Sequence, residues 1–262
     1  MSDRVLGIVP ARLASTRLPN KPLYPLLGRP LIEWVWRRVE EMSVLDEVVV
    51  ATDAEGVAEV CRAMGAPVEM TLPDHPSGTD RVAEVARLEK YSGFRVIANI
   101  QGDEPLLKEA HLAAAIDLVR GKGWEIGTCA TPLMDRETRK DPSVVKVVRA
   151  QSGRAIYFSR SPIPYKRDDK PSLEELSREP FLRHIGIYAY TPEALENWVA
   201  LRPSQLEVLE QLEQLRPLEA GARIGVAVVG AAHPGVDTPA DVAKLEERLL
   251  ELRGAPGGKG KE

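Results

Sequence analysis

Short apolar runs alternate with longer amphipathic segments through the first half of the chain. The runs have the length of strands and contain few polar residues, which is typical of strands buried on both faces of a sheet. The longer segments have the 3.6-residue spacing of helices. The predicted strands cover residues 5–10, 47–51, 68–72 and 95–100, and the predicted helices cover residues 31–42, 54–64, 81–91 and 108–120. This alternation predicts an α/β fold with a doubly wound, mostly parallel sheet.

The second half of the chain has a more mixed pattern. Apolar runs, two of them alternating as in antiparallel strands, predict strands over residues 126–131, 143–149, 157–159 and 183–190. Residues 162–180 are polar and carry several prolines, so we expect an excursion over the surface. A helix over 205–216, a strand over 224–229 and a helix over 241–252 complete the predicted elements.

We find no internal repeat and no linker in the 262-residue sequence. One large α/β domain is therefore expected over residues 1–253, long enough to bury a sizeable core. The glycine-rich end of the chain, residues 254–262, has low complexity and is predicted to be disordered.

The overall composition is that of an ordinary globular chain, with 44% hydrophobic and 28% charged residues. The net charge of −4 argues against partners such as nucleic acid or an anionic membrane surface. We expect no membrane helix, because no apolar run approaches the roughly 18 residues that a span needs. The N-terminus also lacks the apolar segment of a signal peptide. Cys61 and Cys129 are too few for a disulfide framework, so a cytoplasmic location is expected.

Basic and hydroxyl residues are concentrated in the loop that follows the first predicted strand. It carries Arg12, Ser15, Thr16, Arg17 and Lys21. Such a density of charge-assisted donors suits a triphosphate. The loop has neither the G-x-x-x-x-G-K-[ST] pattern of a P-loop nor the G-x-G-x-x-G pattern of a dinucleotide site. The alternative is a solvated surface loop whose charge has no function.

Polar loops follow two further predicted strands, at residues 52–53 and 101–105. Ligands of open α/β sheets bind beyond the carboxyl ends of the strands. We therefore expect these two loops and residues 11–25 to converge on one site.

Eight segments in the same order resemble the motifs of the CMP-Kdo synthetases, the 3-deoxy-manno-octulosonate (Kdo) cytidylyltransferases. They are IVPARLASTRLPNKPL, VVVATD, HPSGTDRVAEV, NIQGDEPL, YFSRSPIPY, FLRHIGIYAY, LEQLR and GVDTP, within residues 5–242. The resemblance implies a sheet of the nucleotide-diphosphosugar-transferase type with a smaller β lobe used for homodimerisation. It also implies the reaction of CTP with Kdo to give CMP-Kdo and pyrophosphate for lipopolysaccharide biosynthesis.

The resemblance implies roles for the residues of the nucleotide half of the site. Asp103 and Asp237 would bind Mg²⁺, and Arg17 and Lys21 would act with Asp103 in catalysis. The residues expected to bind CTP are Arg12, Ser15, Arg17, Lys21, Asp53, Ser77, Gly78, Thr79, Arg81 and Gln101. The alternative for Ser77, Thr79 and Asp80 is helix capping, and for Asp103 and Asp237 it is a turn or a cap.

The acceptor sugar is expected at residues of the second half. Arg160, Arg183 and His184 would supply positive charge for the Kdo carboxylate. His184 and Tyr188 share one side of the predicted strand and would flank a gap for the sugar. The resemblance, through the segment LEQLR, also implies that Glu213 and Gln214 contact Kdo. On a continuous helix over 205–216, Glu213 falls on the apolar side, so it must pair with a cation or face the ligand.

Other functions remain open at this point. The nearest is a cytidylyltransferase for N-acylneuraminate, another nonulosonate or 8-amino-Kdo. A second is a scaffold or nucleotide sensor on the same fold, which would not need the carboxylates and the basic loop together. A third is a histidine-based hydrolase, although the sequence shows no nucleophile elbow.

Overall fold

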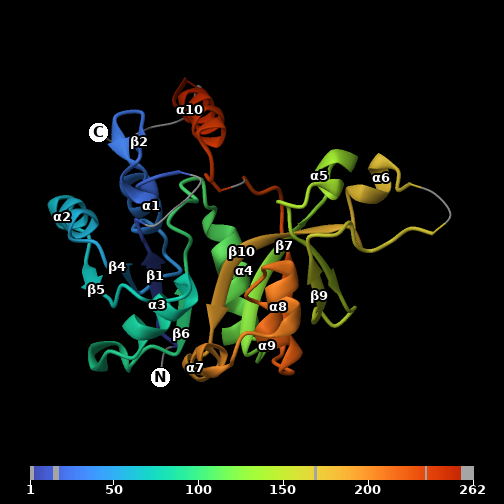
Figure 1. The fold of residues 1–262 in the computed structure, drawn as a ribbon, viewed down its shortest axis with the longest axis horizontal. Coiled ribbons are helices and arrows are strands. Elements are labelled where there is room, and N and C mark those ends of the chain that lie inside the picture. The colour runs from blue at the N-terminus through green and yellow to red at the C-terminus, as the bar shows by residue number, and fades with distance from the viewer. Residues whose placement is uncertain (1–2, 14–17, 168–169, 234, 255–262) are drawn as a thin grey trace.

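The fold is built on a nine-stranded sheet, which the computed structural model shows running through the molecule (Figure 1). The structure describes residues 3–13, 18–167, 170–233 and 235–254. The strand order is β11-β7-β10-β6-β1-β4-β5, with β8 added to β10 and β9 added to β8. The strands are β1 (Val5–Pro10), β4 (Glu47–Thr52), β5 (Val68–Met70), β6 (Val96–Asn99), β7 (Ile126–Pro132), β8 (Lys146–Arg149), β9 (Ala155–Ser159), β10 (Leu182–Tyr190) and β11 (Ile224–Val228).

The sheet is mostly parallel, as predicted. β6, β1, β4 and β5 pair in parallel with one another, and β7 pairs in parallel with β11. β10 runs antiparallel to both of its neighbours, β6 and β7, and so joins the two parallel groups. The carboxyl ends of both groups therefore lie along the same edge of the sheet.

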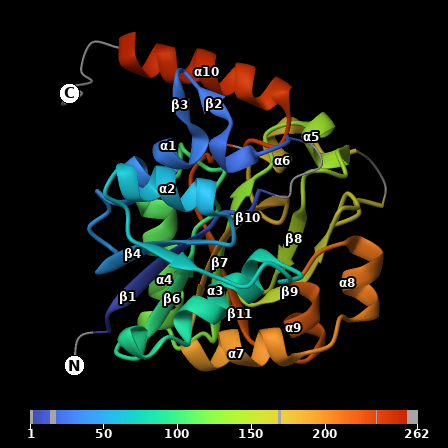
Figure 2. The same cartoon turned by 60° about the vertical axis from the view of Figure 1, so that its left-hand side comes forward.

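Helices cover both faces of the sheet and bury a core on each. One core packs α1, α2 and α4 against the sheet, and the other packs α3, α7 and α9 against the opposite face (Figure 2). In β1, Val5 and Val9 join the first core while Leu6 and Ile8 join the second. The helices are α1 (Leu31–Val39), α2 (Glu55–Ala63), α3 (Gly78–Ala86), α4 (Glu109–Arg120), α7 (Pro192–Ala200), α8 (Gln205–Glu210), α9 (Leu215–Glu219) and α10 (Pro239–Gly254). Short 3₁₀ helices cover Lys21–Leu23 and Glu89–Tyr91. Burial on both faces explains the uninterrupted apolar runs of the strands.

A smaller lobe extends the sheet at β8 and β9. It carries the short helices α5 (Arg136–Lys140) and α6 (Leu173–Leu176), which lie side by side at one end of the molecule (Figures 1 and 2). Leu133, Leu176 and Phe181 form a separate small core beneath them.

The C-terminal helix α10 lies against an element from the start of the chain. This is the hairpin of β2 (Pro25–Leu26) and β3 (Arg29–Pro30), beside which α10 runs in both views (Figures 1 and 2). Leu26, Leu245 and Leu249 share a buried cluster, and the backbone amide of Leu27 donates to Glu246 at 3.0 Å. This packing places the segment before α10 next to the loop that follows β1.

Several predicted helix limits are wrong, and two of these differences affect the site. The predicted helix over 205–216 is two helices, α8 and α9, because Gln211 has the left-handed φ of 51° and ends α8. The helix predicted to begin at residue 81 begins at Gly78, where the Ser77 hydroxyl accepts a hydrogen bond from the amide of Asp80. The short helices α5 and α6 and the β2–β3 hairpin were not predicted, nor was α7, despite its Thr191 cap and its proline in the first turn.

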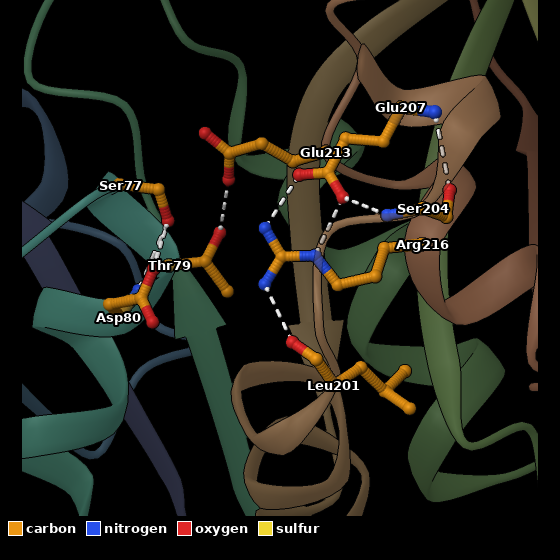
Figure 3. Close-up of polar contacts among 8 residues, drawn as sticks. All are labelled: Ser77, Thr79, Asp80, Leu201, Ser204, Glu207, Glu213 and Arg216. Atoms are coloured by element: carbon orange, nitrogen blue, oxygen red, sulfur yellow. Dashed lines mark hydrogen bonds and ion pairs between the residues drawn. The ribbon is translucent and has the colours of Figure 1, made fainter.

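A buried ion pair holds α8 and α9 together across this break (Figure 3). The Arg216 guanidinium donates to the Glu207 carboxylate through Nε at 2.7 Å and through Nη2 at 2.5 Å. The backbone amide of Ser204 also donates to Glu207, at 3.2 Å. Although burial alone would raise it, these contacts lower the pKa of the Glu207 carboxyl. The pair therefore fixes the turn over residues 211–214.

Replacing Arg216 by Met should destabilise the fold by about 3–5 kcal/mol, because it leaves the Glu207 carboxylate buried without its cation. Since the folded-state pKa of Glu207 is lowered, the stabilisation by the pair is fully present above the ordinary pKa of a Glu carboxyl and is lost as the pH falls through the lowered pKa, so the difference between wild type and variant should shrink in acid. The measurement is urea unfolding as a function of pH. The matched control is Arg87→Met, which removes an ion pair to Glu196 whose side chains are 53% and 42% exposed, and should cost at most about 1 kcal/mol. Equal losses in the two variants would contradict this assignment.

Candidate active site

The polar loops meet at the carboxyl ends of β1, β4 and β6. The amide of Ala11 donates to the carbonyl of Ala51 at 2.8 Å, which joins the loop after β1 to the end of β4. Gly102, after β6, lies so close to β1 that a Cβ there would come within 2.8 Å of the Pro10 carbonyl oxygen. A glycine at this position therefore allows the loops after β1 and β6 to touch.

The Lys21 ammonium joins two carboxylates from distant parts of the chain. Its Nζ donates to Asp103 in a short contact and to Asp237 at 2.9 Å. Burial alone would lower the pKa of Lys21, but the two carboxylates raise it on balance. The amide of Val236 donates to the carbonyl of Asp103 at 3.0 Å, which ties the segment before α10 to the loop after β6.

Asp103 and Asp237 have the chemistry to hold Mg²⁺ together with a bound triphosphate. Both carboxylates already contact one cationic group, the Lys21 ammonium, so they share a position suited to positive charge. Within the described ranges, no group of three or more His, Cys, Asp or Glu residues is arranged to hold a metal. A pair is sufficient for Mg²⁺, which commonly takes one or two carboxylates and completes its shell with water and phosphate oxygens.

A cavity of about 490 Å³ lies beside these carboxylates, and we refer to it as the Asp103 cavity. Its polar lining residues are Gln101, Asp103, Glu104, Ser143, Arg183, His184, His233, Asp237, Thr238 and Asp241. Burial, and then the neighbouring Asp103, raise the pKa of Glu104 to about 8. Burial lowers the pKa of Arg183, although Glu104 opposes this shift.

A second cavity, of about 260 Å³, adjoins the first, and we refer to it as the Glu213 cavity. Its lining residues are Thr79, Asn99, Gln101, Val145, His184, Gly186, Tyr188, Trp198, Gln211, Leu212, Glu213 and Gln214. Four residues line both cavities, namely Gln101, Val145, His184 and Gly186. The two spaces therefore form the two halves of one site.

Glu213 lies in the turn between α8 and α9 and faces Thr79 from the start of α3 (Figure 3). The Thr79 hydroxyl donates to the Glu213 carboxylate at 3.1 Å. Burial raises the pKa of Glu213, and its hydrogen bonds to Thr79 and Ser77 partly oppose this shift. Glu213 thus lines a cavity because of the turn, and the reasoning from a continuous helix was wrong.

A bulge in β10 sets the position of His184. Ile185 pairs with Cys129 and Tyr188 pairs with Thr128, so two residues of β10 are inserted between adjacent positions of β7. The rings of His184 and Tyr188 therefore meet, with their centroids 5.5 Å apart. The predicted gap between these two side chains is closed by this contact, and the cavity lies beside them.

His184 does not carry the positive charge that the sequence analysis assigned to it. Burial, and then the adjacent Arg183, lower the pKa of His184 to about 3. Its ring is neutral at neutral pH, so it can act as a hydrogen-bond partner but not as a cation for a carboxylate.

Two predicted cationic residues, Arg160 and Arg81, contact protein groups instead of lining the two cavities. Arg160 donates to the carbonyls of Glu210, Pro142 and Gln211, at 2.7, 2.9 and 3.2 Å. Arg81 is only 2% exposed and contacts Thr71 and Asp53, the latter at 3.3 Å. Arg12 is exposed at the start of the first loop, while Ser15 and Arg17 lie outside the described residues.

Several residues that line the cavities were not predicted from the sequence, or were predicted without a role. Glu104 follows Asp103 directly, so its position after a buried strand was a usable signal. Trp198 belongs to the helix that was not predicted, and Asn99 lies within a strand whose apolar pattern hides it. Lone polar residues inside strands give no sequence signal until the sheet is known.

The chain is similar to known cytidylyltransferases over nearly its whole length. A family model described as "Cytidylyltransferase" matches residues 6–224. The chain is 48% identical to the "3-deoxy-manno-octulosonate cytidylyltransferase" of Gemmatimonas aurantiaca, over 96% of each sequence. It is 46% identical to the protein of the same name from Chromohalobacter salexigens, over 97% of this chain and 100% of that one.

Solved structures give the same result. The structure of a CMP:2-keto-3-deoxy-manno-octonic acid synthetase complexed with CTP superposes with a TM-score of 0.85 at 36% identity, over 95% of this chain and 99% of that one. The inositol-1-phosphate CTP transferase of T. maritima, at 16% identity and a TM-score of 0.65, shares the fold. Since the family match runs from β1 to the start of β11 and the relatives align almost end to end, the chain belongs to the cytidylyltransferase family.

Proposed function

We propose that the chain transfers CMP from CTP to Kdo, releasing pyrophosphate and supplying CMP-Kdo for lipopolysaccharide biosynthesis. The observation that supports this most directly is the contact of Lys21 with both Asp103 and Asp237, two residues that line one half of a two-part cavity. A site for positive charge beside a large cavity with many polar lining residues suits a nucleotide triphosphate and an acceptor sugar. The name shared by the relatives identifies the sugar.

In the proposed reaction a sugar hydroxyl attacks the α-phosphorus of CTP. The new bond joins this oxygen to phosphorus, the bond from the α-phosphorus to the bridging oxygen of pyrophosphate breaks, and the hydroxyl loses its proton. When bound at Asp103 and Asp237, Mg²⁺ would neutralise phosphate charge and favour in-line displacement. Lys21 would move from these carboxylates to the phosphates and stabilise the departing pyrophosphate, and Arg12 and Arg17 would add charge there.

The residues before and at the start of α3 would bind the nucleoside. Ser77 and Thr79 carry hydroxyl groups, Gly78 is the first residue of α3, and Gln101 lines both cavities from the loop after β6. Arg81 would act indirectly, because its ion pair holds Asp53 and the end of β4 in place. Base selectivity follows when a wrong base leaves these buried polar groups unpaired.

The acceptor would lie in the Glu213 cavity with its carboxylate toward Arg183. Glu213, Gln214, Tyr188 and His184 offer neutral and charged partners for sugar hydroxyls. The half-buried Arg183 lines the adjoining Asp103 cavity and remains cationic, so it replaces His184 as the partner we propose for the carboxylate. Arg160 would contribute through its hold on the end of α8.

We also propose a homodimer that works in the cytoplasm, where CTP is made. The lobe around α5 and α6 exposes Met134, Tyr165 and Leu173, at 66%, 81% and 61%, and such side chains favour burial against a second copy. Among the described helices, none combines the length and hydropathy that a membrane crossing requires. Sedimentation equilibrium should give twice the mass of one chain. Replacing Tyr165 and Leu173 by Ser should lower the measured mass to that of a single chain. A wild-type monomer at micromolar concentration would contradict the dimer.

The substrate assignment is tested by pyrophosphate release. With CTP and Mg²⁺, the protein should turn over Kdo at least about a hundredfold more efficiently than N-acetylneuraminate, because a site built around a sugar's polar groups rejects an acceptor that leaves them unpaired. 8-Amino-Kdo is the second comparison, and ATP in place of CTP tests the base. Turnover of N-acetylneuraminate with no reaction of Kdo would refute the proposed acceptor.

A further inference from the structure

The hydroxyl of Thr128 lies inside the bulge of β10 and contacts three groups of that strand. Its Oγ1 is 2.9 Å from Nε2 of His184, 2.7 Å from the carbonyl oxygen of Ile187 and 3.2 Å from that of Ile185. Thr128 itself is fully buried on β7. Its hydrogen bonds are therefore made with these groups alone or left unmade, because water does not reach it.

The number of protons decides how these contacts are made. A hydroxyl has one proton to donate and two lone pairs with which to accept. If the proton went to His184, the carbonyl oxygens of Ile185 and Ile187 would face another oxygen with no hydrogen between them. If it goes to Ile187, the nearer carbonyl, the hydroxyl oxygen can accept a proton from Nε2 of His184. The second arrangement gives hydrogen bonds to both His184 and the Ile187 carbonyl, whereas the first gives one to His184 alone, so the second is favoured.

We propose that Thr128 is a positioning residue, which holds His184 in the tautomer that carries its proton on Nε2 and so makes Nδ1 a hydrogen-bond acceptor for a hydroxyl of the acceptor sugar. The neighbouring rings of Phe158 and Tyr188 lie 5.0 and 5.5 Å away, between centroids, and restrict the orientation of the imidazole. The substrate part of this inference rests on the proposed function. The tautomer does not.

The remaining nitrogen of His184 is available to a ligand. Nδ1 makes no hydrogen bond to any residue in the described part of the chain, and it is not among the buried polar atoms that lack a partner. His184 lines both cavities, and Nδ1 is its one ring nitrogen that Thr128 does not contact. A neutral acceptor here recognises hydroxyl groups and disfavours a second carboxylate oxygen, which has no proton to give at neutral pH.

The same hydroxyl also supports the bulge. By donating to Ile187 it satisfies a carbonyl displaced from the regular register, and the inserted Gly186 turns its own carbonyl to Gln101, whose Nε2 donates at 3.2 Å. Thr128 on β7 thus contacts His184 directly and is linked to Gln101 through the bulge of β10. Both of these side chains line the junction of the two cavities.

The test uses variants that separate the hydroxyl from the shape of the side chain. Thr128→Val keeps the branched side chain without the hydroxyl, and Thr128→Ser keeps the hydroxyl. Thr131→Val makes the same change at a buried position of the same strand. Imidazole nitrogen NMR of ¹⁵N-histidine-labelled protein without ligands reports the tautomer of each of the four histidines, and His184→Gln assigns the signal.

Wild type, Thr128→Ser and Thr131→Val should show a protonated Nε2 and an unprotonated Nδ1 at His184, and Thr128→Val should show a mixed or reversed tautomer. In Thr128→Val the KM for Kdo should rise about tenfold, the effect of one lost hydrogen bond, while the KM for CTP and kcat change less than about twofold. A wild-type proton on Nδ1, or a tautomer unchanged in Thr128→Val, would overturn the role of Thr128.

The two inferences fail in different ways. If the tautomer changes in Thr128→Val but the KM for Kdo does not, the positioning role in acceptor binding is overturned while the hydrogen-bond assignment stands. If wild type shows the expected tautomer but does not turn over Kdo, the proposed substrate is wrong.

Discussion

The contact of the Lys21 ammonium with Asp103 and Asp237 is the interaction on which the site depends. It joins the loop after β1, which carries Lys21, to the loop after β6 and to the segment before α10. Asp103 lies 82 residues and Asp237 lies 216 residues from Lys21 along the chain. Two carboxylates so close together would repel each other without a cation between them. The packing of α10 on the β2–β3 hairpin brings Asp237 to this position, so the stability of a distant helix contact and the geometry of the charged cluster are linked.

The sheet supplies the other constraint. β10 runs antiparallel between two parallel groups, and its bulge shifts the register by two residues where the Asp103 and Glu213 cavities meet. A regular strand would place residue 186 opposite Thr128 and leave its hydroxyl without the carbonyl of Ile187. The irregular strand instead brings a neutral histidine to the junction, together with the Gly186 carbonyl, which accepts a hydrogen bond from Gln101. The Glu207–Arg216 pair fixes the turn that carries Glu213 on the opposite side.

Much of the fold could be predicted because its strands are buried on both faces and its first half repeats a simple strand–helix alternation. The strand over Val5–Pro10 has the predicted limits, and the helix over 109–120 differs by one residue. The break between α8 and α9 was harder to predict. Gln211 adopts a left-handed conformation that favours glycine or asparagine, so nothing in its residue type marked the end of α8. The His184 charge was misassigned because burial, which the sequence does not show, determines its pKa.

The central claim is that Asp103 and Asp237 form one cation site that acts together with bound CTP. Electron paramagnetic resonance of Mn²⁺, used in place of Mg²⁺ and titrated into the protein with CTP, tests it directly. Wild type and the exposed-helix control Asp117→Asn should bind the ion alike. Asp103→Asn and Asp237→Asn should each weaken binding by at least roughly tenfold, since even residues one shell further from a metal have effects of that size. Wild-type binding in both of these variants would contradict the account.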